Sequence, residues 1–321
     1  MRQKDLLNDG PYLVYGASGV IGTMSCYQNE EPYVAVVKDG AGVGRVMACK
    51  GKSSVLGTMQ ALLPSKNVDL NYLLHLVRSL KLGDDFSGST IPHIYFRDYG
   101  EREVPAIAIK QQIMIAGVLD KIEMMLARLD MTLKKQDQLV KSRFVEMFGD
   151  IDEWHSANMS EVCSIITDGT HQPPKFVSEG IPFLFVSNIA GNALTYETTK
   201  YVSEADYEIL IKRTPIEVGD VLVSAVGSFG HPAVVRRSRP FCFQRHIAYL
   251  KPKRELIDSD YLHAVLLSDK AQRYMDKVAK GVAQRTVTLK SFKEMMIPLP
   301  PLKLQQQFAD FVAQVDKSGF A

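Results

Sequence analysis

The stretch Gln111–Phe148 reads QQIMIAGVLDKIEMMLARLDMTLKKQDQLVKSRFVEMF, and it decides the architecture of the chain. No proline interrupts it, and Gly149 follows as a natural helix terminator. Its seam residues recur at alternating spacings of four and three, the period of a helix that packs along one side against another helix. Such a helix is about 50 Å long, too long for the core of one small domain. The seam positions are Ile115, Leu119, Ile122, Leu126, Leu129, Leu133, Gln136, Val140, Arg143 and Met147.

A long helix with such a seam needs a partner, and the chain offers one near its other end. The segment 302–316 places apolar residues on one face, namely Leu304, Phe308, Phe311, Val312 and Val315. We therefore predict that the two helices pair as an antiparallel coiled coil, with Gln136 and Arg143 as polar seam positions that set the register. The alternative is a simple linker helix between two domains.

The sequence on either side of the long helix contains the same pattern twice. Each copy has a short apolar strand that runs into a glycine turn, then an acidic helix cap, then a proline-marked approach to a helix. The offset between copies grows from 187 at the first pair of segments to 193 at the last, as duplicated domains with small loop insertions would produce. The paired segments are Val34–Gly40 with Val221–Gly227, Asp69–Leu73 with Asp258–Leu262, and Pro105–Gln112 with Pro298–Gln305.

This organisation predicts the α+β fold class, with two β-rich domains separated by long helices that form the antiparallel coiled coil. The first domain is short at its start, and the last helix is much shorter than its expected partner. We therefore expect an N-terminally incomplete first domain and a chain truncated at both ends. The expected boundaries are 1–104 for the first domain, 105–149 for the spacer helix, 150–297 for the second domain and 298–321 for the second helix.

The composition is that of an ordinary globular protein, with 46% hydrophobic and 23% charged residues. No apolar stretch is long enough for a membrane span, and the polar start lacks a signal sequence, so no membrane association is expected. The four cysteines lie far apart without CxxC spacing, which indicates reduced thiols in the cytoplasm and no metal site. A net charge of +2 gives no general electrostatic argument for nucleic acid, although two short basic stretches occur at 236–239 and 251–254.

One glycine-rich motif suggests an enzyme. Leu13–Gly22 (LVYGASGVIG) resembles the nucleotide loop of short-chain dehydrogenases, and Tyr196 with Lys200 supplies a YxxxK pair. That loop requires a helix of ten or more residues after its last glycine, whereas only nine residues, Thr23–Glu31, separate Gly22 from Pro32. Glycines in a turn between short strands explain the motif without a nicotinamide cofactor. We find no other catalytic pattern and expect no catalytic residue, no cofactor and no metal.

With these repeats in order, the chain resembles the specificity subunits of type I restriction–modification systems. Ile297–Gln305 (IPLPPLKLQ) is similar to the family's approach to a conserved helix, and Val104–Gln112 is a degraded copy. Tyr15–Gly22 and Glu30–Gly40 resemble one class of target recognition domain. The second domain resembles another class in the segments 180–189 and 219–230.

The resemblance implies a non-catalytic subunit of a restriction endonuclease and DNA adenine methyltransferase complex. Each domain would read one half of a split site in double-stranded DNA. The helices would set the distance between the halves and bind the methyltransferase subunits, and a motor-nuclease subunit would complete the complex. The alternative within this architecture is a scaffold that binds the methyltransferase without reading DNA.

Base reading requires polar side chains on loops held by a rigid β scaffold. The loops 88–93 and 281–286 occupy equivalent places in the two repeats, just before the proline-marked segments, and are the first candidates. The residues expected to contact DNA are Arg45, Ser89, Thr90, His93, Lys175, Asn188, Ser228, Arg245, Gln284, Arg285 and Thr286.

Overall fold

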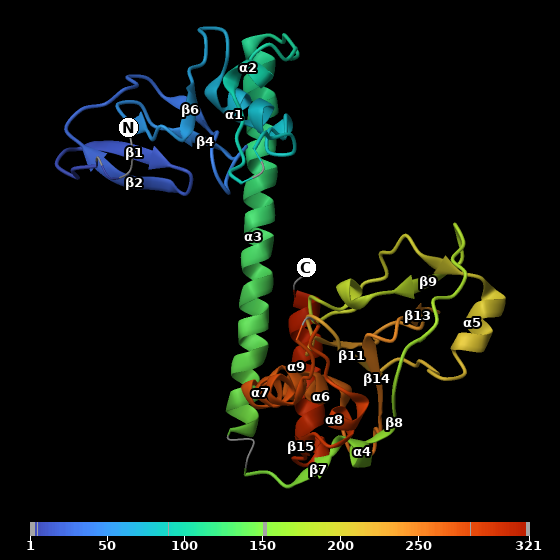
Figure 1. Cartoon of the computed structure of the whole chain (residues 1–321). Helices are drawn as coiled ribbons and strands as arrows, with labels where there is room; N and C mark the ends of the chain where they lie inside the picture. The colour runs from blue at the N-terminus through green and yellow to red at the C-terminus, as the bar shows by residue number, and fades with distance from the viewer. Residues whose placement is uncertain (1–3, 5, 89, 150–152, 283, 319–321) are drawn as a thin grey trace. The chain divides into compact units, whose positions relative to one another are not determined.

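The computed structural model describes residue 4 and residues 6–88, 90–149, 153–282 and 284–318. Its contacts divide the chain into two compact units, Met1–Asp130 (unit 1) and Met131–Ala321 (unit 2). The division falls inside the long helix α3 (Ile109–Phe148), which is continuous and confirms the helix predicted at 111–148 (Figure 1). Gly149 follows it in the left-handed region, with φ 56°. The domain boundaries expected from the sequence stay predictions.

Unit 1 is built around a buried strand, β3, which lies between two antiparallel neighbours. Val34 and Val36 face helix α1 (Leu70–Ser79), whereas Tyr33, Ala35 and Val37 face a second small sheet of order β2-β1-β5. The strand is therefore apolar on both faces, which is why its sequence is a continuous apolar run. The strands are β1 (Tyr12–Gly16), β2 (Gly19–Met24), β3 (Tyr33–Val37), β4 (Val46–Cys49), β5 (Ser54–Val55) and β6 (Met59–Leu62).

The glycine-rich motif near the start forms a β-hairpin. Strand β1 pairs antiparallel with β2 through a turn between Gly16 and Gly19. No helix follows the glycines, so the geometry that would hold a pyrophosphate on a helix N-terminus is not formed there. This confirms the turn interpretation of the motif.

Helix α1 (Leu70–Ser79) packs beside the first turns of α3 in unit 1. Asp69 caps it by accepting a hydrogen bond from the Tyr72 N–H at 2.9 Å. His75 Nε2 lies 2.8 Å from Asp120 Oδ1, and Arg78 Nη1 donates to Glu123 at 2.8 Å. These contacts fix α1 against α3, and the short helix α2 (Phe96–Tyr99) follows before α3 begins.

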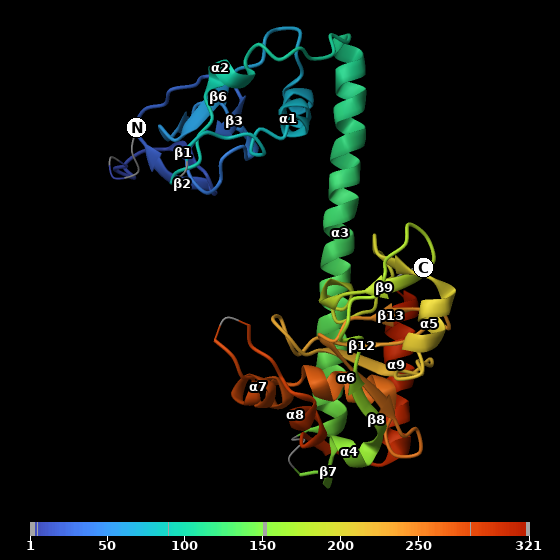
Figure 2. The same cartoon turned by 45° about the vertical axis from the view of Figure 1, so that its right-hand side comes forward.

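Unit 2 contains a four-stranded antiparallel sheet of order β12-β11-β14-β8. Alternate residues of its central strands enter different cores. Val221 and Val223 face the helices, whereas Leu222 packs with Phe241 and Phe243 on the other side. Helices α6, α8 and α9 gather beside the last turns of α3 on the helical face (Figure 2). The sheet strands are β8 (Cys163–Asp168), β11 (Val221–Ser224), β12 (Pro232–Val234) and β14 (Ile247–Pro252).

Smaller elements complete unit 2. One sheet has the order β10-β9-β13, and β15 pairs with β7. The short strands are β7 (Ser156–Asn158), β9 (Ile181–Leu184), β10 (Tyr201–Val202), β13 (Cys242–Phe243) and β15 (Met296–Pro298). The helices are α4 (Met159–Val162), η2 (Val186–Asn188), α5 (Glu204–Leu210), α6 (Ser259–Leu267), α7 (Asp269–Val278), α8 (Leu289–Lys293) and α9 (Leu302–Ser318).

Within unit 2, helix α9 contacts the last turns of α3. Gln136 Nε2 donates to the Val315 carbonyl at 3.1 Å, and the rings of Phe144 and Phe308 lie 5.6 Å apart. The earlier residue of α3 meets the later residue of α9, so these two segments run in opposite directions. Gln136 and Arg143, the polar seam positions, contact the α9 residues Val315 and Phe311.

A buried glutamine repeats in the two units with the same partners. In unit 2, Gln305 Oε1 accepts from the Asp258 N–H at 2.9 Å, and its amide donates to the carbonyls of Leu256 and Pro300. In unit 1, Gln112 Oε1 likewise accepts from the Asp69 N–H at 2.9 Å. Its amide donates to carbonyls in the equivalent places. The repeat predicted from the sequence therefore extends to the hydrogen bonds that join each capped helix to the helix after the prolines.

Among the described residues, no helix combines the length and the apolar character that crossing a membrane requires.

Candidate nucleic-acid interface

All four strands of the unit 2 sheet have one terminus at the same side of the sheet, and we call this side, which runs across the strand ends, an edge. Ser224 at the end of β11 pairs with Ile247 at the start of β14, and Val223 pairs with Pro232 at the start of β12. Asp168, the last residue of β8, pairs with Ala248. The loops 169–176, 225–231 and 244–246 therefore leave the sheet together at this edge.

A fourth loop from far along the chain joins them. Residues 280–286 close on themselves, with the Lys280 N–H donating to the Thr286 carbonyl at 2.9 Å and the reverse bond at 2.8 Å. The Gly227 N–H donates to the Arg285 carbonyl at 2.9 Å, and the Val287 N–H donates to the Ala225 carbonyl at 2.8 Å. We call the four loops 169–176, 225–231, 244–246 and 280–286 the loop end of unit 2.

Unit 1 has the same arrangement at the end of β3. The Gly40 N–H donates to the Pro92 carbonyl and the Ile94 N–H to the Lys38 carbonyl, both at 2.9 Å. Ser87 and His93 exchange two backbone hydrogen bonds of 2.8 Å, as Lys280 and Thr286 exchange theirs in unit 2. The equivalence of the loops 88–93 and 281–286, predicted from their positions in the sequence, is confirmed by this backbone pairing.

Glycine is required at the start of both loops. Gly88 and Gly281 have φ of 93° and 108°, in the region that disfavours side chains. A Cβ at either position would also collide with a backbone carbonyl, that of Ile91 or of Gln284. The same local geometry is thus encoded twice.

The cations at the loop end of unit 2 differ in how firmly they are held. Arg285 Nη1 donates to Asp276 Oδ1 at 2.7 Å, and its guanidinium lies 5.3 Å from the Phe229 ring centroid. Arg245 is exposed, and its backbone N–H donates to the Thr170 carbonyl at 3.0 Å. Burial, and then the neighbouring Arg245 cation, lower the pKa of His246.

An acidic residue also lies at this edge. Asp168 accepts from Arg213 at 2.5 Å and lies 3.1 Å from His171 Nε2. Its charge is therefore met by a cation, which limits the repulsion that a lone carboxylate would exert on a phosphate chain.

Most of the expected unit 2 contacts come together at the loop end. Ser228, Arg245, Gln284, Arg285 and Thr286 all lie on its loops, and Lys175 is exposed on the loop that follows β8.

Asn188 is different, because its side chain is only 4% exposed. Its Oδ1 accepts from the Phe185 N–H at 2.9 Å, and its amide donates to Thr195 and to the Glu197 carbonyl. The expectation of a DNA contact at Asn188 does not fit this burial, because its side chain holds a loop together.

Of the unit 1 residues expected to contact DNA, two are exposed and one is bound to a side chain of the protein. Arg45 is exposed and donates to the Ala17 carbonyl at 2.8 Å, and Thr90 is exposed on the loop 88–93. His93 Nδ1 binds Asp39, while its Nε2 is buried and has no hydrogen-bond partner within the described ranges. In this conformation the His93 ring ties two loops together. Ser89 lies outside the described residues.

Sequence reasoning missed one polar connection at this end of unit 2. His231 joins Ser228 to Asn192, a residue 39 positions earlier in the chain, by hydrogen bonds of 3.0 Å on either side of its ring. No local pattern signals such a pairing, because the partners meet only through the fold.

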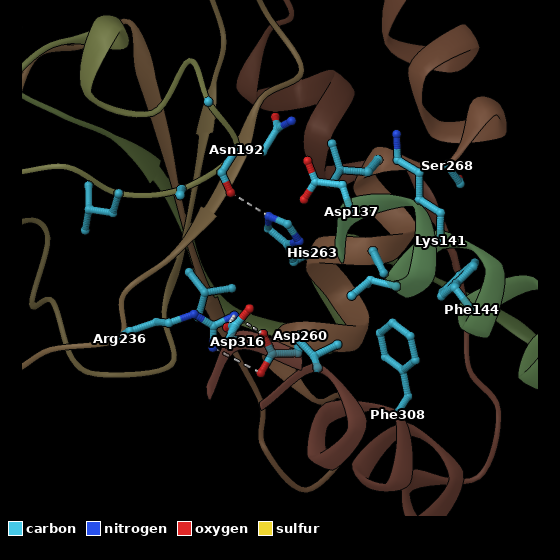
Figure 3. A pocket seen from close by; sticks show the side chains of 18 of the residues that line it. Asp137, Lys141, Phe144, Asn192, Arg236, Asp260, His263, Ser268, Phe308 and Asp316 are labelled. Atoms are coloured by element: carbon cyan, nitrogen blue, oxygen red, sulfur yellow. Dashed lines mark hydrogen bonds and ion pairs between the residues drawn. The ribbon is translucent and has the colours of Figure 1, made fainter. Parts of the chain in front are cut away.

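Behind this connection, unit 2 contains a groove of about 1390 Å³. It is bounded by the last turns of α3, by α6 and α9, and by the loop that carries Asn192 (Figure 3). One of its cations, Arg236, forms ion pairs with two acidic side chains of the lining. Arg236 Nη2 lies 2.6 Å from Asp260 Oδ1 and 3.8 Å from Asp316 Oδ2. His263 Nε2 donates to the Asn192 carbonyl at 2.9 Å.

Among the described residues, no group of three or more His, Cys, Asp or Glu side chains is arranged to hold a metal ion. The four cysteines are unpaired thiols. Burial raises the pKa of Cys49 to about 11 and the pKa values of Cys163 and Cys242 to about 12, so these three thiols remain protonated at neutral pH.

Residues 151–320 match the family model described as the type I restriction modification DNA specificity domain. The chain is 22% identical over 318 residues to the type I restriction enzyme MjaVIII specificity subunit of Methanocaldococcus jannaschii, covering 88% of this chain and 72% of that one. It is also 22% identical over 262 residues to the EcoBI specificity subunit of Escherichia coli, covering 71% of this chain and 54% of that one.

Among solved structures, the fold is similar to the type I restriction–modification S subunit from M. genitalium. The TM-score is 0.61 at 17% sequence identity, over 99% of this chain and 85% of that one. At this identity the likeness shows the fold alone.

Proposed function

The chain belongs to the family of type I restriction–modification DNA specificity proteins, and from that premise we propose that it reads a split site in double-stranded DNA, one half with each unit. The observation that carries the proposal is the loop end. In both units, loops from separate parts of the chain are tied by equivalent backbone hydrogen bonds to the end of a buried strand.

The chemistry of the loop end of unit 2 fits the major groove. Base edges there present donors and acceptors that polar side chains distinguish, and phosphates are met by cations and backbone N–H groups. We assign base reading to Ser228, Gln284 and Thr286, and phosphate contacts to Arg245 and Lys175. Arg285 is held by Asp276 and Phe229 and can serve either role.

Unit 1 supplies the second half of the reader in this proposal, with Arg45, Thr90 and Ser89 as contacts and His93 as the residue that ties the loops. The repeated backbone geometry at Gly88 and Gly281 supports equal roles for the loops 88–93 and 281–286.

Replacing Arg245 by alanine tests the phosphate contact. We expect DNA affinity to fall about 3-fold for every sequence alike, and the slope of log affinity against log salt to decrease by about 1. The measurement is a salt titration of DNA binding by the complex with methyltransferase subunits. Arg254→Ala is the matched control, because Arg254 is exposed and donates to Val218, near the start of β11 at the opposite edge of the sheet. Equal effects of the two variants on DNA affinity would argue against a DNA contact at the loop end of unit 2.

We further propose that α3 and α9 pair as an antiparallel coiled coil over the last turns of α3, where Gln136 contacts α9. The contacts between α9 and the last turns of α3 support this, since Phe308 and Val312 are 0% and 8% exposed there. The repeat places Ile115, Leu119 and Ile122 in positions equivalent to Phe308, Val312 and Val315 of α9. Ile115 and Ile122 are 38% and 46% exposed, so the equivalent face of α3 is available to a helix.

The seam continues as an apolar stripe through Leu126, Leu129 and Leu133, which are 49–61% exposed. Exposed apolar stripes of this length mark interaction surfaces. We propose that assembly with methyltransferase (M) subunits, and then with a motor-nuclease (R) subunit, covers it.

The double substitution Leu126→Gln and Leu129→Gln tests this stripe. We expect the chain alone to keep its stability, because both side chains are exposed and glutamine favours helix about as well as leucine. Assembly with methyltransferase subunits should weaken about 10-fold, since part of two leucine side chains is no longer buried. Met124→Gln with Met131→Gln is the control, because these methionines are equally exposed but lie off the seam. Unchanged assembly of the leucine variant would exclude the stripe as the contact.

In this account the chain itself carries out no catalysis and acts in the cytoplasm, where its DNA lies. Methylation and cleavage belong to the partner subunits. The rival function is a scaffold that binds methyltransferase without reading DNA. Selection from a randomised DNA library by the methyltransferase complex separates the two. Enrichment of one two-part sequence supports reading, and recovery of random sequences supports the scaffold.

A further inference from the structure

A chain of hydrogen bonds fixes the hydroxyl of Ser228 at the loop end of unit 2. Ser228 Oγ lies 3.0 Å from His231 Nε2, and His231 Nδ1 lies 3.0 Å from Asn192 Oδ1. Ser228 is exposed, whereas the bond between His231 and Asn192 is partly buried. One end of the chain therefore faces solvent and the other end faces the protein.

The loop that carries Ser228 is held on both sides. Before it, the Gly227 N–H donates to the Arg285 carbonyl at 2.9 Å. After it, the His231 N–H donates to the buried Ser224 hydroxyl oxygen at 2.9 Å, and Gln272 Nε2 donates to the Gly230 carbonyl at 2.8 Å. The serine thus lies on a fixed support, as a residue that discriminates between ligands requires.

Asn192 is fixed equally well. Its backbone is in the left-handed region, at φ 59°, which asparagine tolerates better than most residues. Its N–H donates to the Ile189 carbonyl at 3.0 Å, and its carbonyl accepts from His263 Nε2 at 2.9 Å (Figure 3). Burial lowers the pKa of His263, so the partner of Asn192 is a neutral imidazole that donates from Nε2.

These contacts determine which atom carries the hydrogen at each step. Asn192 Oδ1 can only accept, so His231 Nδ1 must donate to it. A neutral imidazole with its proton on Nδ1 has only a lone pair on Nε2, so the Ser228 hydroxyl must donate its hydrogen to His231. The remaining lone pairs of Ser228 Oγ face solvent. Ser228 therefore offers an acceptor outward and no donor.

We propose that Ser228 is a specificity-determining residue that selects a hydrogen-bond donor on the DNA, with His231 and Asn192 as its positioning residues. In the major groove only adenine and cytosine carry an exocyclic amine, whereas guanine and thymine present acceptors, as does every phosphate. Ser228 accordingly requires the exocyclic amine, that of adenine or that of cytosine, of one base pair in the half-site read by unit 2. This inference rests on the proposed function.

The test removes the Ser228 hydroxyl and the base amine, first separately and then together. The methyltransferase complex is offered its selected DNA at pH 8. The contacted base is replaced by purine in place of adenine, or by 2-pyrimidinone in place of cytosine. Ser228→Ala and the base change should each weaken binding about 10-fold, and together no more than either alone, because both remove the same hydrogen bond.

Three further variants sharpen the result. His231→Ala frees the hydroxyl to donate or accept, so it should relax the same base position. Asn192→Asp keeps an acceptor facing His231 Nδ1 and should preserve the preference for adenine or cytosine. Ser160→Ala, an exposed serine on α4 at the opposite edge of the sheet, should change no position.

The outcomes separate this inference from the function on which it rests. A base pair whose recognition relaxes in Ser228→Ala but does not change when its amine is removed would overturn the inference alone. So would an intact half-site in which Ser228→Ala changes no position, or additive losses in the paired test. A wild-type complex that selects no half-site through unit 2 would overturn both the inference and the proposed function.

Discussion

Replacing Gln305 by alanine is expected to lower the free energy of unfolding of unit 2 by about 3 kcal/mol. The side chain is fully buried, and its amide joins the cap of α6 to the start of α9. Removal leaves the Asp258 N–H and the carbonyls of Leu256 and Pro300 without this partner, and the bond to Pro300 is buried. An unsatisfied buried group costs about 1–3 kcal/mol, and the cavity left by the side chain adds to the loss.

Hydrogen–deuterium exchange of the full chain measures this effect unit by unit, which a single unfolding transition would not. Peptides from α6 should exchange roughly 100-fold faster in Gln305→Ala, while peptides from α1 stay unchanged. Gln112→Ala should do the reverse, because Gln112 holds the equivalent bonds in unit 1. Gln306→Ala, exposed on the same helix, is the control. If Gln305→Ala and Gln306→Ala behaved alike, the glutamine bonds would not hold the unit together.

Replacing Phe308 by alanine is expected to lower the stability of unit 2 by about 4 kcal/mol. The ring is fully buried on α9 and lies 5.6 Å from both Phe144 and Phe148 on α3. Its loss removes burial and several aromatic contacts from a core that close packing leaves little freedom to refill. Because those contacts join α9 to α3, the last turns of α3 should lose protection together with α9.

Phe311→Ala is the matched comparison, because Phe311 is the same residue type on the same helix but only half-buried. It lies beside Arg143, whose guanidinium is 5.6 Å from the ring centroid, and its loss should cost about 1 kcal/mol. The measurement is hydrogen exchange across 136–148 and 302–316 in both variants. A Phe308 variant with unchanged protection in 136–148 would show that these two helix segments are stable without each other.

The sequence predicted the elements that depend on local chemistry. The length of α3 followed from its uninterrupted four-three seam, and the starts of α1 and α6 followed from the capping residues Asp69 and Asp258. The match between the loops 88–93 and 281–286 followed from their equal distance to the prolines. Each of these signals is written within a few neighbouring residues.

What the sequence could not predict depends on partners brought together by the fold. Asn188 looked like a free polar residue, yet it is buried because a 3-10 turn directs its amide into a loop. His231 and Asn192 meet across 39 residues, and Gln305 reaches a backbone N–H that lies 47 residues earlier. Spacing along the chain carries no information about such contacts.

The central claim is that each unit reads its own half of one DNA site, and mapping of methylated adenines tests it most directly. The chain is assembled with its methyltransferase subunits, and the modified positions are read by sequencing the DNA. Wild type should give one two-part sequence with a fixed gap. Ser228→Ala with Arg285→Ala should relax one half only, and Arg45→Ala with Thr90→Ala should relax the other. Methylation without a shared two-part sequence, or substitutions in one unit that change both halves, would contradict the account.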